Sequence, residues 1–331
     1  MIFTICAIPL PSPLPLDNRA ILPLDNRAIL PLDNRAILAL DNRAILALDN
    51  RAILPYSFRM LEHNFFAQPP RVLAHRGDSE FYPENTLPAF ISAEKLKVDV
   101  IETDVHLTAD NDVVIWHDKT LDRQTNGTGI VEVLTLKQLQ MLDAGYYYTK
   151  DNGETFPFRG TGVTLMSLDE ALETLPDMRF NIDLKTKDSQ LPVKFAEIVG
   201  KHNAMDRILG ASFHTENLQA LRSLMPGMAT SFSTYEVFTL FLKQKFGFRP
   251  SSREKLKGQV LQVPERYGIL KVLTDRFMQS FHDAGLYIHV WTINNEADMR
   301  RLIRMGADAI FTDNPRLLQK VYADLALINS P

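Results

Sequence analysis

The sequence predicts an α/β protein: a (β/α)8 TIM barrel with a hairpin excursion after strand 2 and a disordered N-terminal repeat extension. Short runs rich in β-branched and aromatic residues alternate with segments of helical periodicity, which is typical of a parallel sheet. The 331-residue length is sufficient, because such a barrel takes about 250 residues. Eight runs are predicted as barrel strands, at residues 72–74, 99–104, 179–184, 208–213, 228–232, 260–263, 287–291 and 309–312.

Helical segments fit between most of these strands. They cover residues 86–96, 167–175, 192–202, 215–224, 275–284 and 296–305. In a parallel barrel the catalytic groups gather at the carboxyl ends of the strands. His75, Glu102, Asp104, Asp183 and Trp291 all fall at such ends, so the sequence predicts one site at one end of the barrel.

The composition and the net charge exclude some classes of function. With 45% hydrophobic and 23% charged residues, the chain can bury one large core. A net charge of −4 provides no basic field to attract nucleic acid, so no nucleic-acid partner is expected. No run approaches the roughly 20 apolar residues that span a bilayer, and the apolar start lacks a basic region, so it makes a poor signal peptide. We therefore expect a cytoplasmic protein without a transmembrane segment.

Residues 15–54 are five tandem octads, three of them Pro-Leu-Asp-Asn-Arg-Ala-Ile-Leu and two with Ala first. An eight-residue period gives a helix no sustained apolar stripe, and repeated prolines interrupt helix propagation. The identity of the units favours recent duplication or a start assigned upstream of Met60; a β-solenoid or a partner-binding arm is the alternative. We expect residues 1–55 to be a disordered extension, 56–71 to be an aromatic segment that caps the barrel, and 72–325 to be the barrel domain.

Four short motifs carry the predicted chemistry. They place two imidazoles, four carboxylates and a guanidinium within 44 residues. A phosphodiester is anionic and repels nucleophiles, so its hydrolysis needs a cation to mask that charge, an acid for the departing alkoxide and a base for the attacking oxygen. All three kinds of group occur in His75-Arg76-Gly77, Glu84-Asn85-Thr86, Glu102-Thr103-Asp104 and His117-Asp118.

Spacing brings these motifs together. Glu102 and Asp104 lie at i and i+2 of a predicted strand, so their carboxylates share one face and repel each other without a cation. A turn-rich cluster at 109–112 follows, and the chain resumes as a second strand, which predicts a hairpin. If the turn is centred between residues 110 and 111, position 117 falls opposite position 104. The hairpin is then expected to return His117 to the carboxylates.

At this point the sequence resembles the glycerophosphodiester phosphodiesterase family, from about Val72 to about Pro315. The resemblance implies a (β/α)8 barrel, a divalent metal held by Glu102, Asp104 and Asp183, and two catalytic histidines at 75 and 117. The family usually has Glu where this chain has Asp183, and sphingomyelinase D-like phospholipases use Asp there but lack the Pro-Glu-Asn-Thr segment. The matching motifs are Ala74-His75-Arg76-Gly77, Pro83-Glu84-Asn85-Thr86, Glu102-x-Asp104, His117-Asp118, Asn181-Ile182-Asp183-Leu184-Lys185, Val290-Trp291-Thr292-Ile293-Asn294 and Thr312-Asp313.

The three carboxylates form an oxygen-only set, which favours one Mg²⁺ or Ca²⁺, with Mn²⁺ as a third option, over zinc. Arg76 and Lys185 are the predicted partners of the substrate phosphate. Glu84 and Asn85 are expected either to contact substrate or to hydrogen-bond the first turn of the following helix. Trp291 is expected to wall the pocket, with core packing as the alternative.

The sequence therefore predicts metal-dependent hydrolysis of glycerophosphodiesters to glycerol 3-phosphate and an alcohol, with the two histidines as general acid and base in an unassigned order. Lysophospholipase D-type hydrolysis of a lysolipid at the same site is the alternative, and a catalytically silent binding protein is the alternative outside enzymes. The apolar stretch 237–248 is expected to pack on the barrel, with an acyl chain or membrane-surface contact as the second interpretation. The oligomeric state stays open.

Overall fold

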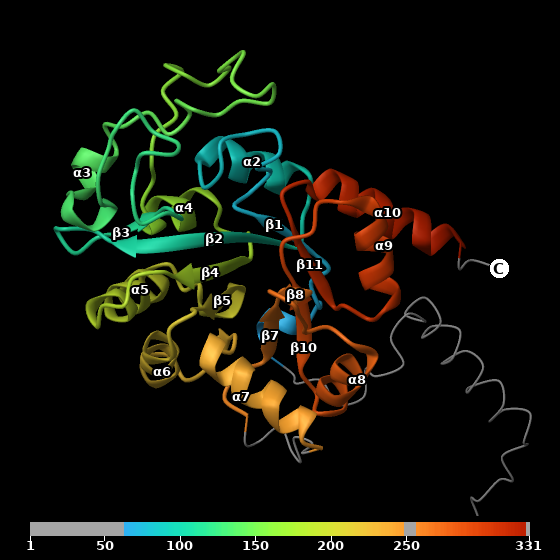
Figure 1. Ribbon diagram of the computed structural model, residues 1–331. Helices are drawn as coiled ribbons and strands as arrows, with labels where there is room; N and C mark the ends of the chain where they lie inside the picture. The colour runs from blue at the N-terminus through green and yellow to red at the C-terminus, as the bar shows by residue number, and fades with distance from the viewer. Residues whose placement is uncertain (1–62, 248–255, 329–331) are drawn as a thin grey trace, which may run out of the picture. The chain divides into compact units, whose positions relative to one another are not determined.

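The computed structural model describes residues 63–247 and 256–328. The predicted extension at 1–55 and the first part of the predicted capping segment lie outside these residues. Eight parallel strands with surrounding helices form the predicted barrel (Figure 1). The barrel strands are β1 (Val72–His75), β2 (Val100–Leu107), β4 (Phe180–Leu184), β5 (Ile208–Ala211), β6 (Ala229–Thr230), β7 (Val260–Val263), β10 (Tyr287–Val290) and β11 (Ala309–Thr312).

The strands follow one another around the barrel in the order β6, β5, β4, β2, β1, β11, β10 and β7. A parallel bridge between Ser231 and Val260 joins the two ends of this order. The Gln259 amide also donates to the Thr230 carbonyl (2.9 Å) across the same seam. The sheet is thus nearly closed, and the carboxyl ends of all eight strands lie at one end of the barrel, which we call the mouth.

The six predicted helices are present, and two further long helices, α7 and α10, were not predicted. Ser167 and Ser233 begin α4 and α7 with capping boxes, in which the serine hydroxyl accepts from the third helical amide while a Glu side chain reaches back. The longer helices are α2 (Leu87–Lys95), α4 (Leu168–Thr174), α5 (Gln190–Lys201), α6 (Thr215–Leu224), α7 (Thr234–Lys245), α8 (Asp275–Asp283), α9 (Glu296–Arg304) and α10 (Pro315–Ile328). Among the described residues, no helix is long and apolar enough to cross a membrane.

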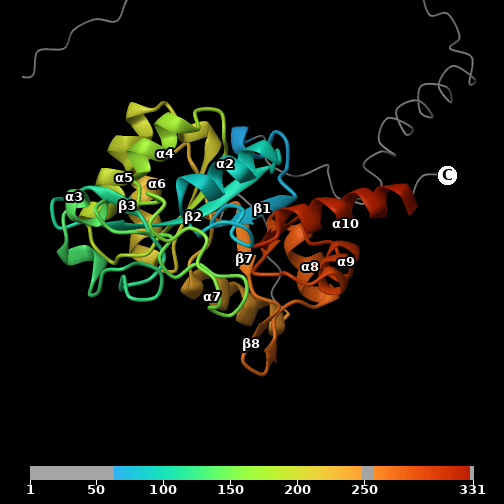
Figure 2. The same ribbon diagram turned by 90° about the horizontal axis from the view of Figure 1, so that it is seen from above.

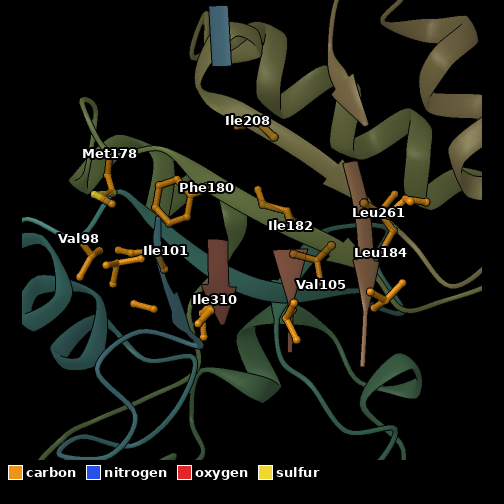
Figure 3. Close-up of a cluster of buried hydrophobic side chains, with 14 of the residues drawn as sticks. Val98, Ile101, Val105, Met178, Phe180, Ile182, Leu184, Ile208, Leu261 and Ile310 are labelled. Atoms are coloured by element: carbon orange, nitrogen blue, oxygen red, sulfur yellow. The ribbon is translucent and has the colours of Figure 1, made fainter. Parts of the chain in front are cut away.

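The main core lies between the strands and the surrounding helices, as Figure 3 shows for Ile101, Val105 and Ile182. These residues alternate with the inward-facing positions of the same strands. Inside the barrel a second apolar cluster fills the end opposite the mouth, where Phe66 of the short helix η1 (Asn64–Phe66) stacks on Tyr287 at 4.2 Å between ring centroids. The polar inward-facing residues are therefore concentrated nearer the mouth.

A hairpin follows the second barrel strand, as predicted, but its register differs by one residue. Strand β3 (Val113–Ile115) pairs antiparallel with β2 so that Val105 faces Ile115. The loop of residues 108–112 has an odd length, because Thr108 hydrogen-bonds Asp110 and the Asp112 amide around a left-handed Asn111 (φ 61°). Position 116 rather than 117 therefore lies opposite 104, and the Trp116 amide donates to the Asp104 carbonyl (3.0 Å).

Beyond β3 the chain makes an excursion over residues 117–166 before α4 begins. It contains the short helices η2 (Val131–Val133) and α3 (Leu136–Leu139). With Val114 and Trp116 of the preceding hairpin it forms a small core of eight buried residues, which includes Leu121 and Leu165. A second, two-stranded hairpin, β8 (Arg266–Tyr267) with β9 (Leu270–Lys271), follows β7 and extends away from the body of the barrel (Figure 2).

Candidate active site

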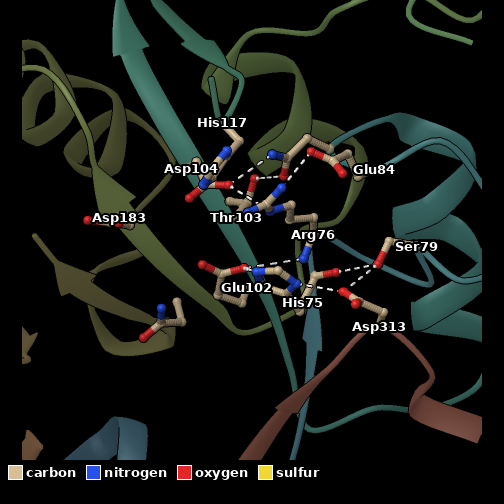
Figure 4. A network of polar contacts seen from close by, with 12 residues as sticks. His75, Arg76, Ser79, Glu84, Glu102, Thr103, Asp104, His117, Asp183 and Asp313 are labelled. Atoms are coloured by element: carbon tan, nitrogen blue, oxygen red, sulfur yellow. Dashed lines mark hydrogen bonds and ion pairs between the residues drawn. The ribbon is translucent and has the colours of Figure 1, made fainter. Parts of the chain in front are cut away.

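Three buried carboxylates line the inner wall of the barrel near its mouth. Glu102 and Asp104 are on β2, and Asp183 is on the neighbouring β4, directly opposite Asp104 in the parallel register. Figure 4 shows Glu102 beside His75 and Asp104 beside His117, with Asp183 further along the same wall. Burial of three anions is costly unless cations or protons compensate them.

Lys185 provides one such cation. Its ammonium lies between two carboxylates, 2.8 Å from Asp104 Oδ1 and 2.7 Å from Asp183 Oδ2. Burial acts to lower the Lys185 pKa, but these two charges outweigh it and raise the pKa above its ordinary value. Burial acts to raise the Asp104 pKa, but Lys185 and Arg76 outweigh it and hold that pKa far below its ordinary value. Both groups therefore stay charged.

Glu102 is less well compensated. Burial, reinforced by the neighbouring Asp104 charge, raises the pKa of Glu102 to about 7. Asp183 Oδ1 is likewise buried and has no hydrogen-bond partner among the described residues, and burial raises the pKa of Asp183 as well. Within the same part of the chain, no three His, Cys, Asp or Glu side chains are grouped as a ready metal site.

His75 ends β1 with its ring directed by a carboxylate. Its Nδ1–H donates to Asp313 Oδ1 at 2.6 Å, and its Nε2 lies 3.9 Å from Glu102 Oε2. Burial acts to lower the His75 pKa, but Glu102 and Asp313 outweigh it and the pKa is raised. The tight turn that follows needs Gly77 (φ 90°), because a Cβ there would stand 2.8 Å from the Ala89 Cβ.

His117 has the same arrangement on the other side of the carboxylates. Its Nδ1–H donates to Asp118 Oδ1 at 2.6 Å, and its carbonyl accepts from His106 Nε2 at 3.2 Å. The residue lies just past β3, so the one-residue register difference does not take it out of the site (Figure 4). Burial, supported by the Arg76 and Lys185 charges, lowers the His117 pKa although Asp104 acts to raise it.

A chain of ion pairs connects the two histidine sides. Arg76 Nη1 lies 2.6 Å from Glu84 Oε1, and Arg123 Nη2 lies 2.7 Å from the same oxygen. Arg123 Nε in turn pairs with Asp118, the carboxylate that orients His117. Glu84 thus holds two guanidinium groups in place, and Arg76 Nε remains 3.5 Å from Asp104 Oδ2.

Asn85 and Trp291, for which the sequence left two roles open, have the following surroundings. Asn85 is only 2% exposed; its Nδ2 donates to Asp104 Oδ2 (3.0 Å) and its Oδ1 accepts from the Thr103 hydroxyl (2.7 Å). Both ends of the amide are therefore used inside the protein, which favours a structural role, although not as a cap of α2. Trp291 is half-buried against the barrel interior and contacts Phe213 edge to face, at 6.0 Å between ring centroids.

A polar cavity of about 310 Å³ opens beside His75. Arg76, Glu84 and Asp313 line it on the barrel side, and residues 148–150 of the excursion line it on the other. The Tyr148 hydroxyl donates to the Glu80 carbonyl (2.9 Å), which ties the excursion to the loop after β1. The cavity is large enough for a small polar molecule, and charged and hydroxyl groups dominate its wall.

Two residues of this site were assigned no role from the sequence. Asp313 stood in a matching motif, Thr312-Asp313, and its position at the end of β11 was the available signal. Arg123 lies in an irregular segment, and no local pattern places it against Glu84, which is 39 positions earlier.

Comparison with known proteins identifies the chain. The family model described as the glycerophosphoryl diester phosphodiesterase family matches residues 75–317, which contain every residue of the site. The chain belongs to this family. Glycerophosphodiester phosphodiesterases are phosphoric diester hydrolases, so the match confirms the predicted family and enzyme class and disfavours the catalytically silent alternative.

Individual members agree with this assignment. A glycerophosphodiester phosphodiesterase of Bacillus subtilis is 31% identical over 264 residues, which cover 76% of this chain and 87% of the relative. A lysophospholipase D of Mus musculus is 24% identical over 76% of this chain and 81% of the relative. A phosphodiesterase of Oleispira antarctica, solved with its product sn-glycerol-3-phosphate, has a TM-score of 0.66 at 26% identity and covers 78% of this chain and 98% of its own.

Proposed function

We propose that this member of the family hydrolyses glycerophosphodiesters to glycerol 3-phosphate and an alcohol by general acid and base catalysis. The observation that carries the proposal is the matched pair of histidines. The Nδ1–H of His75 and that of His117 each donate to a carboxylate, so both Nε2 atoms remain available for proton transfer. The two rings lie on either side of the pair Glu102 and Asp104 (Figure 4). A carboxylate at Nδ1 sets the tautomer that leaves Nε2 free to accept or donate a proton.

The cations of the site suit a phosphate. Arg76 is held by Glu84, and Lys185 is held by two aspartates, so neither has to be ordered when an anion arrives. In the proposed reaction one imidazole takes the proton of the attacking oxygen and the other protonates the departing alkoxide.

We further propose that the enzyme uses one divalent cation, Mg²⁺ or Ca²⁺ with Mn²⁺ as a third option, held by Glu102, Asp104 and Asp183. The donor chemistry fits a hard cation, since all ligands are carboxylate oxygens and Asp183 has one buried oxygen without a hydrogen bond among the described residues. When bound, the cation would mask the phosphate charge.

The polar cavity supports a small, deacylated substrate. A glycerophosphodiester has little apolar surface to bury, so its recognition rests on charges and hydrogen bonds such as those that line the cavity beside His75. A lysolipid would instead require an apolar groove, which is worth about 0.8 kcal/mol per buried methylene. Of the apolar stretch 237–248 that was expected to pack on the barrel, Phe241 in α7 is buried against Phe277, Phe238 is exposed, and residue 248 lies outside the described residues.

The lysolipid alternative retains two supporting observations. Phe213, which is 52% exposed, meets Trp291 at the mouth of the barrel, and these rings offer an apolar surface to a single acyl chain. The mouse relative is named a lysophospholipase D.

The test compares glycerophosphocholine and lysophosphatidylcholine with the full-length protein. We expect the soluble diester to have the higher kcat/KM, and His75→Ala and His117→Ala each to lower its kcat by about 10²- to 10⁴-fold. His214→Ala, on the loop after β5, is the matched control. A tenfold preference for the lysolipid that falls in Phe213→Ser would make the alternative correct, and near-normal rates in either catalytic variant would contradict the histidine mechanism.

A further inference from the structure

Exposed apolar side chains follow three consecutive strands of the barrel. We call Phe213, Tyr235, Tyr267, Ile269 and Leu270 the apolar rim. Phe213 comes two positions after β5, Tyr235 lies in the first turn of α7 after β6, and the other three belong to the hairpin after β7. Since β5, β6 and β7 are neighbours and parallel, and each residue follows a carboxyl end, the rim lies at the mouth, as the catalytic groups do.

The hairpin β8–β9 is the most exposed part of this rim. All residues from 266 to 271 are exposed; Tyr267 is 75% exposed and Ile269 is fully exposed. Gly268, at φ 58°, supports the tight turn that places Ile269 at the tip. An isolated two-stranded hairpin is marginally stable in water, and this one, which extends from the barrel (Figure 2), leaves its apolar residues exposed.

Two cationic side chains flank the tip of the β8–β9 hairpin. Arg266 and Lys271 are cross-strand partners in the hairpin, and neither forms an ion pair within the described residues. Like charges opposite each other weaken a two-stranded pair, so an anionic surface facing the hairpin would relieve this repulsion. The adjacent Glu265 does not neutralise them, because its carboxylate is 2.7 Å from Arg301 Nη2. The local charge is thus positive in a chain whose net charge is −4.

We propose that the apolar rim docks on the surface of an anionic phospholipid bilayer. Ile269 and Tyr267 enter the boundary between head groups and acyl chains, and Arg266 and Lys271 meet the lipid phosphates behind them. The apolar tip with a basic collar is what selects this partner, because apolar side chains backed by cations match the boundary between acyl chains and anionic head groups. Docking would turn the mouth of the barrel, and with it the catalytic groups, towards the membrane.

Vesicle binding by the full-length chain tests the proposal without relying on its activity. Cosedimentation with vesicles of phosphatidylcholine and phosphatidylglycerol (about 3:1) is compared with cosedimentation with pure phosphatidylcholine. We expect binding to the mixed vesicles that weakens with salt. Tyr267→Ser/Ile269→Ser is expected to lose at least about tenfold in partition coefficient. Arg266→Ser/Lys271→Ser is expected to lose about 25-fold on mixed vesicles, roughly fivefold for each cation, and most of the salt dependence.

Phe246→Ser is the matched control. Phe246 is 78% exposed but ends α7, about 18 Å along the helix from the mouth, so its loss should leave binding unchanged. Unchanged thermal unfolding shows that each variant is folded. Equal binding by all variants, or equal binding to both kinds of vesicle, would overturn the proposal. Sedimentation velocity without lipid tests whether the rim instead binds a second copy of the chain. Self-association that the hairpin variants abolish would favour that partner and contradict membrane docking.

Discussion

His289 offers a quantitative test of how the barrel interior is packed. It lies on β10, fully buried, and neither ring nitrogen has a hydrogen-bond partner within residues 63–247 and 256–328. Its ring stands between those of Phe66 and Phe311, at 6.3 and 6.2 Å between centroids. Because burial disfavours the charged imidazole, it lowers the His289 pKa to about 3.

This pKa makes stability depend on pH in a defined window. In the unfolded chain a histidine titrates near pH 6.5, so between about pH 3 and 6.5 the unfolded state binds a proton that the folded state does not. The free energy of unfolding therefore falls as the pH falls, by up to about 1.4 kcal/mol per pH unit from this one residue. Between pH 7.5 and 4.5 the loss amounts to about 2.6 kcal/mol.

Replacing His289 by Leu removes the titrating group while roughly keeping its volume. At pH 7.5 we expect equal or higher stability, because two buried nitrogens without partners cost about 1–3 kcal/mol each and repacking offsets part of that gain. The decisive quantity is the change with pH, since packing effects are the same at every pH. Compared with the wild type, His289→Leu should lose about 2.6 kcal/mol less on going from pH 7.5 to 4.5.

Urea unfolding at pH 4.5, 5.5, 6.5 and 7.5, followed by circular dichroism, measures this difference. Other titrating groups, including the active-site carboxylates, are shared by both proteins and cancel in the comparison. His214→Leu controls for the loss of an imidazole as such. If the wild type and His289→Leu keep parallel stability profiles, the residue accepts a proton inside the fold and the reasoning fails.

Three further predictions concern the site and the N-terminus. Exhaustive chelation should abolish turnover, and Mg²⁺, Ca²⁺ or Mn²⁺ should restore it, because Arg76 and Lys185 alone do not balance three buried carboxylates together with the substrate phosphate; full turnover after chelation would contradict the metal mechanism. Asp313→Ala should lower kcat by about 10- to 10³-fold with KM nearly unchanged and shift the acidic limb of the pH–rate profile, since the variant loses the bond that orients His75; an unchanged kcat and pH profile would remove Asp313 from the mechanism. Deleting residues 1–55 should leave the midpoint of thermal unfolding and kcat nearly unchanged, because the repeats offer no sustained apolar face; a large drop in the midpoint would show that they pack on the barrel.

The sequence predicted most of the barrel because its local signals agree with its tertiary structure. The strand predicted at 99–104 corresponds to β2, which begins one residue later, and the helix predicted at 215–224 matches α6 residue for residue. Helix α7 was not predicted, although Ser233 and Glu236 form a capping box at its start. Its residues from 237 to 242 are apolar except for one threonine, and such a run does not show a helical period.

The site was predicted less completely, and the limits have physical causes. Glu102 and Asp104 were placed correctly relative to each other, because a strand fixes the direction of residues two apart. The position of His117 depended on the length of a loop, and side-chain bonds within residues 108–112 shifted the register by one. Arg123 reaches Glu84 only through the tertiary structure, so local sequence patterns did not reveal it.

Charge balance links the geometry of the site to its proposed chemistry. Arg76 and Lys185 supply two positive charges against the carboxylates of Glu102, Asp104 and Asp183, so one negative charge remains if all three are ionised. A diester phosphate would bring a second negative charge into the same buried space. Burial, together with the neighbouring Asp104 charge, raises the pKa of Glu102 to about 7, and a proton on Glu102 would offset only one of these two negative charges. One divalent cation would balance both charges, which is why we regard metal binding and phosphate binding as parts of a single event.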